Sequence, residues 1–120
     1  MEAVEVGKME IVEEKIKEII EEKWEELEDA LEMSQSLRVI VGDWKIYIEG
    51  ENQEIAFSLL RLFDKIDEFC RRKKLDLENL DEADVINEFI DQLEDIFSEY
   101  GFSIAECEGD DTIIFQKTKQ

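Results

Sequence analysis

The residues of this chain that could do chemistry are almost all carboxylates. Its 120 residues include 34 aspartates and glutamates, 14 lysines and arginines, and no histidine. Neighbouring carboxylates can act as general acid and base or bind Mg²⁺. Asp76, Glu78, Asp110 and Asp111 are close enough in sequence to be candidates. Acidic residues are common in the loops of so acidic a chain, so this spacing alone does not indicate a site.

Other catalytic and metal sites lack the residues they need. Ser/His and Cys/His pairs require a histidine, and the chain has neither a glycine-rich phosphate loop nor an EF-hand pattern. Cys70 and Cys107 stand 37 residues apart, without the CxxC spacing of a metal or redox site. We expect both thiols to be reduced and buried. The sequence therefore favours a protein that is not an enzyme and uses no cofactor or metal.

One set of carboxylates is regularly spaced, and we call it the acid row. Its six members recur at steps of three and four residues: Asp81, Asp84, Glu88, Asp91, Asp95 and Glu99. On a helix this spacing places them along one face over about 27 Å. Like charges one turn apart cost about 0.2–0.5 kcal/mol per pair, or about 1–2.5 kcal/mol for the row. Because ordinary helices alternate signs, this row indicates a binding surface; a merely acidic or salt-adapted surface is the alternative.

A second, partial row lies near the N-terminus. Glutamates recur there every four residues, with lysines nearby: Glu10, Glu14, Glu18, Glu22 and Glu26. Residues 1–36 carry 13 acids and four bases, and residues 75–101 carry ten acids and no base. These two segments hold nearly all of the excess charge. We predict that Glu14, Glu18 and Glu22 join the acid row in binding a partner.

The elements that position these residues form one α+β domain over residues 1–120, in the order α-ββ-α-α-ββ. A frayed lead-in over residues 1–8 precedes a helix from Met9 to Met33, whose apolar stripe could pack on the sheet or pair with a second copy. The most apolar stretch, Glu54 to Lys74, predicts the central helix of the core. Its basic end complements the helix macrodipole or serves as a localisation or nucleic-acid signal.

The helix of the acid row is expected from Asp81, its N-cap, to Tyr100, with Gly101 just past its C-terminus. Two hairpins should build a largely antiparallel four-stranded sheet packed with helices. In the first, a Gly42-Asp43 turn would place Val41 opposite Trp44. In the second, Cys107 would lie opposite Thr112. Four apolar residues of the second hairpin would then share a face: Phe102, Ile104, Ile113 and Phe115.

The net charge of −20 argues against nucleic acid and anionic membranes as partners and favours a cationic protein surface. One DNA strand presents a phosphate about every 3.4 Å, and a carboxylate row is a sparser copy that a second row or subunit could make denser. We predict a nucleic-acid mimic that occupies the basic groove of a nucleic-acid-binding protein. In size, charge and helical carboxylate rows the chain resembles small acidic proteins of phages and archaeal viruses. That resemblance implies an anti-restriction or anti-CRISPR inhibitor of a host defence nuclease.

The alternative function is an acidic adaptor or chaperone-like module, a homodimer that binds a partner protein through an apolar groove rimmed with acid. Secretion chaperones are similar in size and acidity. The affinity of a mimic should fall steeply with salt, whereas that of a groove binder should not. No apolar run approaches membrane-spanning length, and residues 1–5 lack the features of a signal peptide. We therefore expect a cytoplasmic protein.

Overall fold

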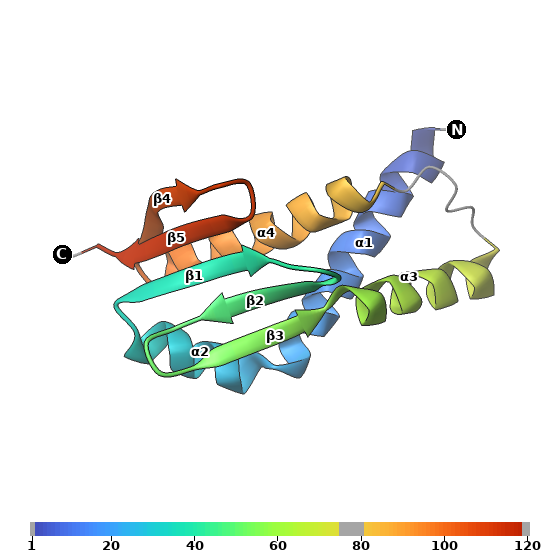
Figure 1. Ribbon diagram of the computed structural model, residues 1–120. Helices are drawn as coiled ribbons and strands as arrows, with labels where there is room; N and C mark the ends of the chain where they lie inside the picture. The colour runs from blue at the N-terminus through green and yellow to red at the C-terminus, as the bar shows by residue number, and fades with distance from the viewer. Residues whose placement is uncertain (1, 75–80, 119–120) are drawn as a thin grey trace.

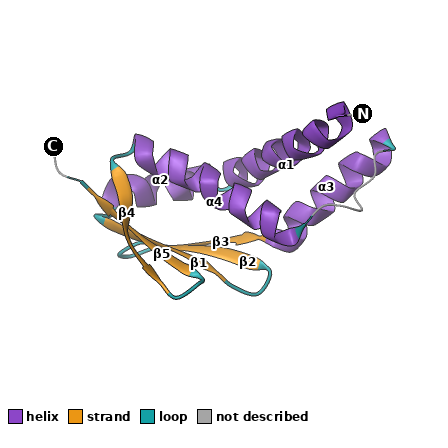
Figure 2. Ribbon diagram, turned by 90° about the horizontal axis from the view of Figure 1, so that it is seen from above, coloured by secondary structure: helices purple, strands orange, loops and turns teal. Residues whose placement is uncertain are grey.

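The computed structural model describes residues 2–74 and 81–118, and the side chains of residues 9–74 and 81–118. In this part of the chain, two of the four helices lie over one face of an antiparallel sheet, and the other two extend past the end of its strands (Figure 1, Figure 2). The helices are α1 (Glu2–Glu22), α2 (Trp24–Met33), α3 (Leu59–Lys73) and α4 (Glu82–Glu99). The strands are β1 (Ser36–Val41), β2 (Lys45–Glu49), β3 (Glu54–Ser58), β4 (Phe102–Glu108) and β5 (Thr112–Lys117).

The sheet has five strands in the order β3-β2-β1-β5-β4. The α+β class is as predicted, but the predicted four-stranded sheet is one strand short. In Figure 2, α2 and α4 lie over the sheet, whereas α1 and α3 extend past the end of the strands. The predicted linker over residues 75–80 lies outside the described residues.

The additional strand, β3, occupies the first five residues of the predicted central helix. Ile55 and Phe57 are buried and alternate with more exposed neighbours, as in a strand with one face on the core. They lie opposite Ile48 and Ile46 of β2. The hydroxyl of Ser58 then accepts a hydrogen bond from the Arg61 N–H at 3.2 Å and caps α3. The prediction of one helix from Glu54 was therefore wrong, because β-pairing captures the residues before this cap.

The predicted helix from Met9 to Met33 is two helices that meet at Lys23. Lys23 has φ −123° and ψ 28°, outside the helical region, and its N–H bonds to the Ile20 carbonyl in a tightened last turn. Its ammonium donates to the carbonyl of Ala56 on edge strand β3, at 2.7 Å. The break turns the chain so that α2 covers the sheet. The expected lead-in over residues 1–8 was also wrong, since α1 begins at Glu2.

The first hairpin forms in a different register from the predicted one. The Gly42 N–H donates to the Lys45 carbonyl at 2.8 Å, so Asp43 and Trp44 make the turn, and Trp44 has φ 59°. Val41 consequently lies opposite Ile46 rather than Trp44. Because the partner moves by two positions, every side chain keeps its face. Trp44 instead leaves the sheet and packs edge-on against Phe63, with 41% of its surface exposed.

The second hairpin is also shifted. Cys107 lies opposite Ile113 rather than Thr112, and β4 has an irregularity between Ile104 and Glu106. Phe102 and Phe115 are buried as predicted, but Ile104 on this edge strand is 47% exposed. The two thiols are not bonded to each other; Cys70 is buried, whereas Cys107 is exposed, which corrects the prediction that both are buried.

Candidate functional site

Helix α4 places the acid row on its outer face because its inner face is anchored in the core. Four apolar residues at steps of four are fully buried: Val85, Phe89, Leu93 and Phe97. Phe89 packs on Phe57 of β3, and Phe97 on Phe115 of β5, with ring centroids 5.4 and 4.8 Å apart. These contacts fix the rotation of the helix. Four members of the acid row therefore point into solvent: Asp84, Asp91, Asp95 and Glu99.

Of the two remaining members of the acid row, one caps helix α4 and the other is half-buried. Asp81 is the N-cap predicted from the sequence, and its carboxylate accepts from the Ala83 N–H at 3.1 Å. Glu88 is half-buried, and burial together with the nearby Glu13 of α1 raises its pKa. Gln92, one turn further on, donates to the Glu13 carbonyl at 3.0 Å. The middle of the row thus lies against α1.

Of the three predicted glutamates of α1, Glu18 and Glu22 are ion-paired with bases. Glu14 is exposed. Glu18 contacts Lys15 at 3.1 Å and Lys65 of α3 at 3.4 Å. A hydrogen bond from Lys15 is the main cause of its lowered pKa.

Glu22 accepts two hydrogen bonds from the guanidinium of Arg61, at 2.9 and 2.7 Å. This bidentate contact lowers the pKa of Glu22. The charges of Glu18 and Glu22 are thus directed toward α3 and balanced there. The structure brings Asp84, Asp91, Asp95 and Glu99 together on one face, and it does not bring Glu18 and Glu22 onto that face.

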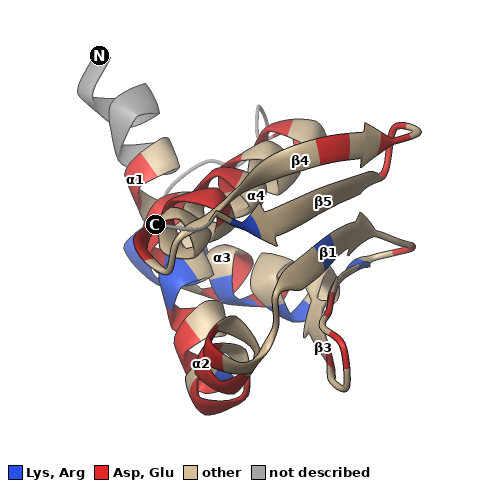
Figure 3. Cartoon of the chain, turned by 90° about the vertical axis from the view of Figure 1, so that its left-hand side faces the viewer, with Lys and Arg blue, Asp and Glu red and all other residues tan. Residues whose placement is uncertain are grey.

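Helix α2 supplies carboxylates that sequence reasoning did not assign to the site. Its ten residues contain five acids and no base, and Figure 3 shows acidic residues along both α2 and α4. At the end of α4, the Tyr100 hydroxyl donates to Glu28 of α2 at 3.3 Å. We call the exposed carboxylates of these two helices the acidic face: Glu25, Glu26, Asp29, Glu32, Glu82, Asp84, Asp91, Asp95 and Glu99. Their run without a base was visible in the sequence, but their proximity to α4 was not.

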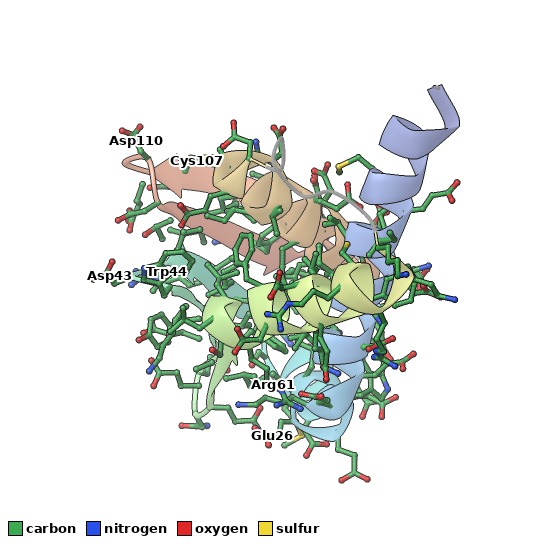
Figure 4. The ribbon with its side chains drawn as sticks, turned by 90° about the vertical axis from the view of Figure 1, so that its right-hand side faces the viewer. Glu26, Asp43, Trp44, Arg61, Cys107 and Asp110 are labelled. Atoms are coloured by element: carbon green, nitrogen blue, oxygen red, sulfur yellow. The ribbon has the colours of Figure 1, made fainter. Side chains whose placement is uncertain are left out.

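The carboxylates first considered for chemistry do not gather into a site. Asp76 and Glu78 lie outside the described residues. Asp110 and Asp111 are exposed at the turn between β4 and β5. In Figure 4, Asp110 lies away from Glu26 of the acidic face. Among the side chains that the structure describes, no group of three or more acidic or cysteine residues is arranged to hold a metal ion.

One further observation concerns the whole of the described chain. None of its helices combines the length and the apolar composition needed to cross a membrane.

Comparisons with protein-family models, with curated proteins and with solved structures find no match to this chain.

Proposed function

We propose that this protein is a non-catalytic acidic binding protein that imitates the phosphate backbone of a nucleic acid. It occupies the basic groove of a nucleic-acid-binding protein, such as a host defence nuclease, and excludes the natural substrate. The observation that supports this proposal is the acidic face, which presents nine exposed carboxylates from two helices that contain no lysine or arginine. A surface of one sign attracts an oppositely charged groove and accelerates the encounter.

The distribution of the basic residues supports the same proposal. The chain has 14 of them, and Lys15, Arg61 and Lys65 neutralise glutamates where α1 meets α3. Helix α4 receives no such partner from its own sequence and keeps its repulsive pairs. Exposed like pairs on a helix cost free energy of folding. A function in binding accounts for their retention.

The second acidic helix increases the density of charge. Along α4 alone, the carboxylates are about one turn, or about 5 Å, apart, whereas phosphates on one DNA strand are about 3.4 Å apart along the axis. The carboxylates of α2 add a second row, which the Tyr100–Glu28 hydrogen bond joins to α4. The alternative function, a dimeric adaptor, would depend less on these charges and more on apolar contact.

The test removes charge from α4 without changing side-chain size. The variant combines Asp84→Asn, Glu88→Gln, Asp91→Asn and Asp95→Asn. A matched control removes four exposed charges from loops, α3 and β4: Asp43→Asn, Glu68→Gln, Glu106→Gln and Asp110→Asn. Both variants change the net charge equally, so only the location differs. Asp43 and Asp110 lie at hairpin turns distant from Glu26 in Figure 4.

The partner is recovered from host lysate by salt elution, and its affinity is measured at two salt concentrations. The α4 variant should bind at least about a hundredfold more weakly, with a smaller salt dependence. The control should bind within a few-fold of the unaltered protein. The partner should also lose nucleic acid when this protein binds. Equal affinity of the two variants, or joint binding of protein and nucleic acid, would contradict mimicry.

A further inference from the structure

A hollow of about 310 Å³ opens between α1 and α4, beside the acidic face. We call it the α1–α4 groove, and its lining residues are Lys17, Ile20, Glu21, Trp24, Gln92 and Ile96. Ile20 is buried and forms the floor, whereas Trp24 and Ile96 are half-buried and keep apolar surface open to solvent. The volume is at the lower end of the range for ligand pockets, so the groove can take one or two apolar side chains.

The groove is preformed because both of its ends are tied. At one end, Gln92 of α4 donates to the Glu13 carbonyl of α1 at 3.0 Å. At the other end, the Tyr100 hydroxyl donates to Glu28 of α2 at 3.3 Å. Along α1, Lys17, Ile20 and Glu21 follow helical steps, and Trp24, the first residue of α2, completes the lining just past the break at Lys23. The apolar part of the lining is formed by Ile20, Trp24 and Ile96, and it can receive side chains from one face of a partner helix.

The charge around the groove is strongly negative. Glu13 and Glu88 lie near the Gln92 end, and Asp95 adjoins Ile96 in sequence. Glu28 and Glu99 raise the pKa of Tyr100 at the other end, in addition to the effect of burial. Glu21 belongs to the lining itself, and Lys17 is the one base among the six lining residues. Such a rim repels nucleic acid and anionic lipid and attracts a cation.

We infer that the α1–α4 groove binds the apolar face of a basic amphipathic helix. This inference rests on the proposed function and names the element that the partner contributes. Its lysines and arginines would lie over the carboxylates of the rim, while one or two apolar side chains would fill the groove between Trp24 and Ile96. The charges attract many basic surfaces, and the groove selects those that also present an apolar residue.

The test uses two synthetic peptides of identical composition, made of leucine and lysine. In the first, leucines recur at helical steps of three and four; in the second, the same residues are shuffled so that no apolar face forms. Both have the same charge, so the acidic face attracts them equally. Trp24 is the reporter in a Trp44→Phe background, since the chain has two tryptophans. Affinity is measured by titration calorimetry beside the emission of Trp24.

The amphipathic peptide should bind at least about tenfold more tightly than the shuffled one and shift the emission of Trp24 to shorter wavelength. Ile96→Asn should remove this preference. Ile86→Asn, a neutral change at a half-buried position of the same helix outside the groove, should preserve it. The comparison of peptides on the unaltered protein is decisive even if a variant folds poorly.

Equal affinity for the two peptides, without a change in Trp24 emission, would overturn the groove inference. If both peptides bound the α4 charge variant more weakly than the unaltered protein, the proposed function would be supported without the groove. Conversely, a preference for the amphipathic peptide at undiminished affinity in the charge variant would support the groove and contradict mimicry. The two hypotheses therefore fail in different measurements.

Discussion

The phenolic hydroxyl of Tyr100 donates a hydrogen bond to a carboxylate oxygen of Glu28 that is 72 residues earlier in the chain and 3.3 Å away. Tyr100 is the C-cap of α4, and Glu28 lies within α2. This neutral donor connects the two acidic helices, and Lys117 of β5 also donates to the Glu32 carbonyl of α2, at 3.5 Å. The contact therefore helps to make one surface out of two separate acidic segments.

The first prediction concerns this pair. Burial and the carboxylates of Glu28, Glu32 and Glu99 raise the pKa of Tyr100 above its usual value. In a Tyr47→Phe background, which leaves Tyr100 as the one tyrosine, the absorbance of tyrosinate should therefore rise at higher pH than in a free tyrosine. Glu28→Gln should move this transition part of the way back. Glu26→Gln is the matched control on the exposed side of α2, and equal transitions in both variants would contradict the contact.

The second prediction compares two phenylalanines under the same substitution. Phe89 is fully buried, whereas Phe63 is half-buried and packs against the exposed Trp44. Phe89→Ala should lower the free energy of unfolding by about 3–5 kcal/mol, because it leaves a cavity under α4. Phe63→Ala should cost clearly less. Urea unfolding of both variants provides the measurement, and a larger loss from Phe63 would mean that the facing of α3 or α4 is wrong.

The third prediction is a pair of opposite pH dependences. The folded pKa of Glu88 is raised, chiefly by burial, so its charge destabilises the fold once the pH rises through that pKa. Glu88→Gln should therefore raise the free energy of unfolding at neutral pH. The gain should disappear as the pH falls below the usual glutamate value of 4.5.

The charge of Glu18 has the opposite effect on the free energy of unfolding. Its folded pKa is lowered by Lys15, so the charge stabilises the fold above the unfolded value and this contribution is lost as the pH falls through the folded pKa. Because the side chain is partly exposed, Glu18→Gln should cost about 0.2–1 kcal/mol at neutral pH. Urea unfolding at neutral and acidic pH measures both variants. If both substitutions changed the free energy of unfolding in the same direction at neutral pH, the environments assigned to Glu88 and Glu18 would be wrong.

Helix α4 could be predicted almost completely from the sequence. Its apolar residues recur every four positions, its N-cap is an aspartate, and Gly101 has the positive φ of 89° expected just past a helix C-terminus. These local signals agree with each other, so the exposure of Asp84, Asp91, Asp95 and Glu99 was also predicted correctly, whereas Glu88 is half-buried. The partners of the α1 glutamates could not be predicted, because Arg61 is 39 residues from Glu22 in sequence.

Strand β3 was missed because Ile55 fits two periodicities, that of a strand with Phe57 and that of a helix with Leu59. Ile55 and Phe57 alternate as in a strand, yet Ile55, Leu59 and Leu62 also follow helical steps. The signal that separates them is Ser58, a favourable N-cap immediately before α3. The register of the first hairpin had no such signal, since Trp44 adopts a φ of 59° that bulky residues rarely adopt. Its packing on Phe63, a tertiary contact, accompanies this turn.

The last prediction tests whether charge at the α1–α4 groove acts locally. Lys17 is the one base among the described residues that line the groove, and it opposes the approach of a cationic helix. Lys17→Gln should therefore tighten binding of the amphipathic leucine–lysine peptide by about two- to fivefold, the effect expected of one exposed charge. Lys45→Gln changes the net charge equally but alters an exposed residue at the start of β2, so it should have a smaller effect. Calorimetric titration at two salt concentrations makes the comparison, and the gain from Lys17→Gln should shrink at the higher one because salt screens the repulsion. An equal gain from both substitutions would mean that the peptide responds to net charge alone and does not lie in the groove.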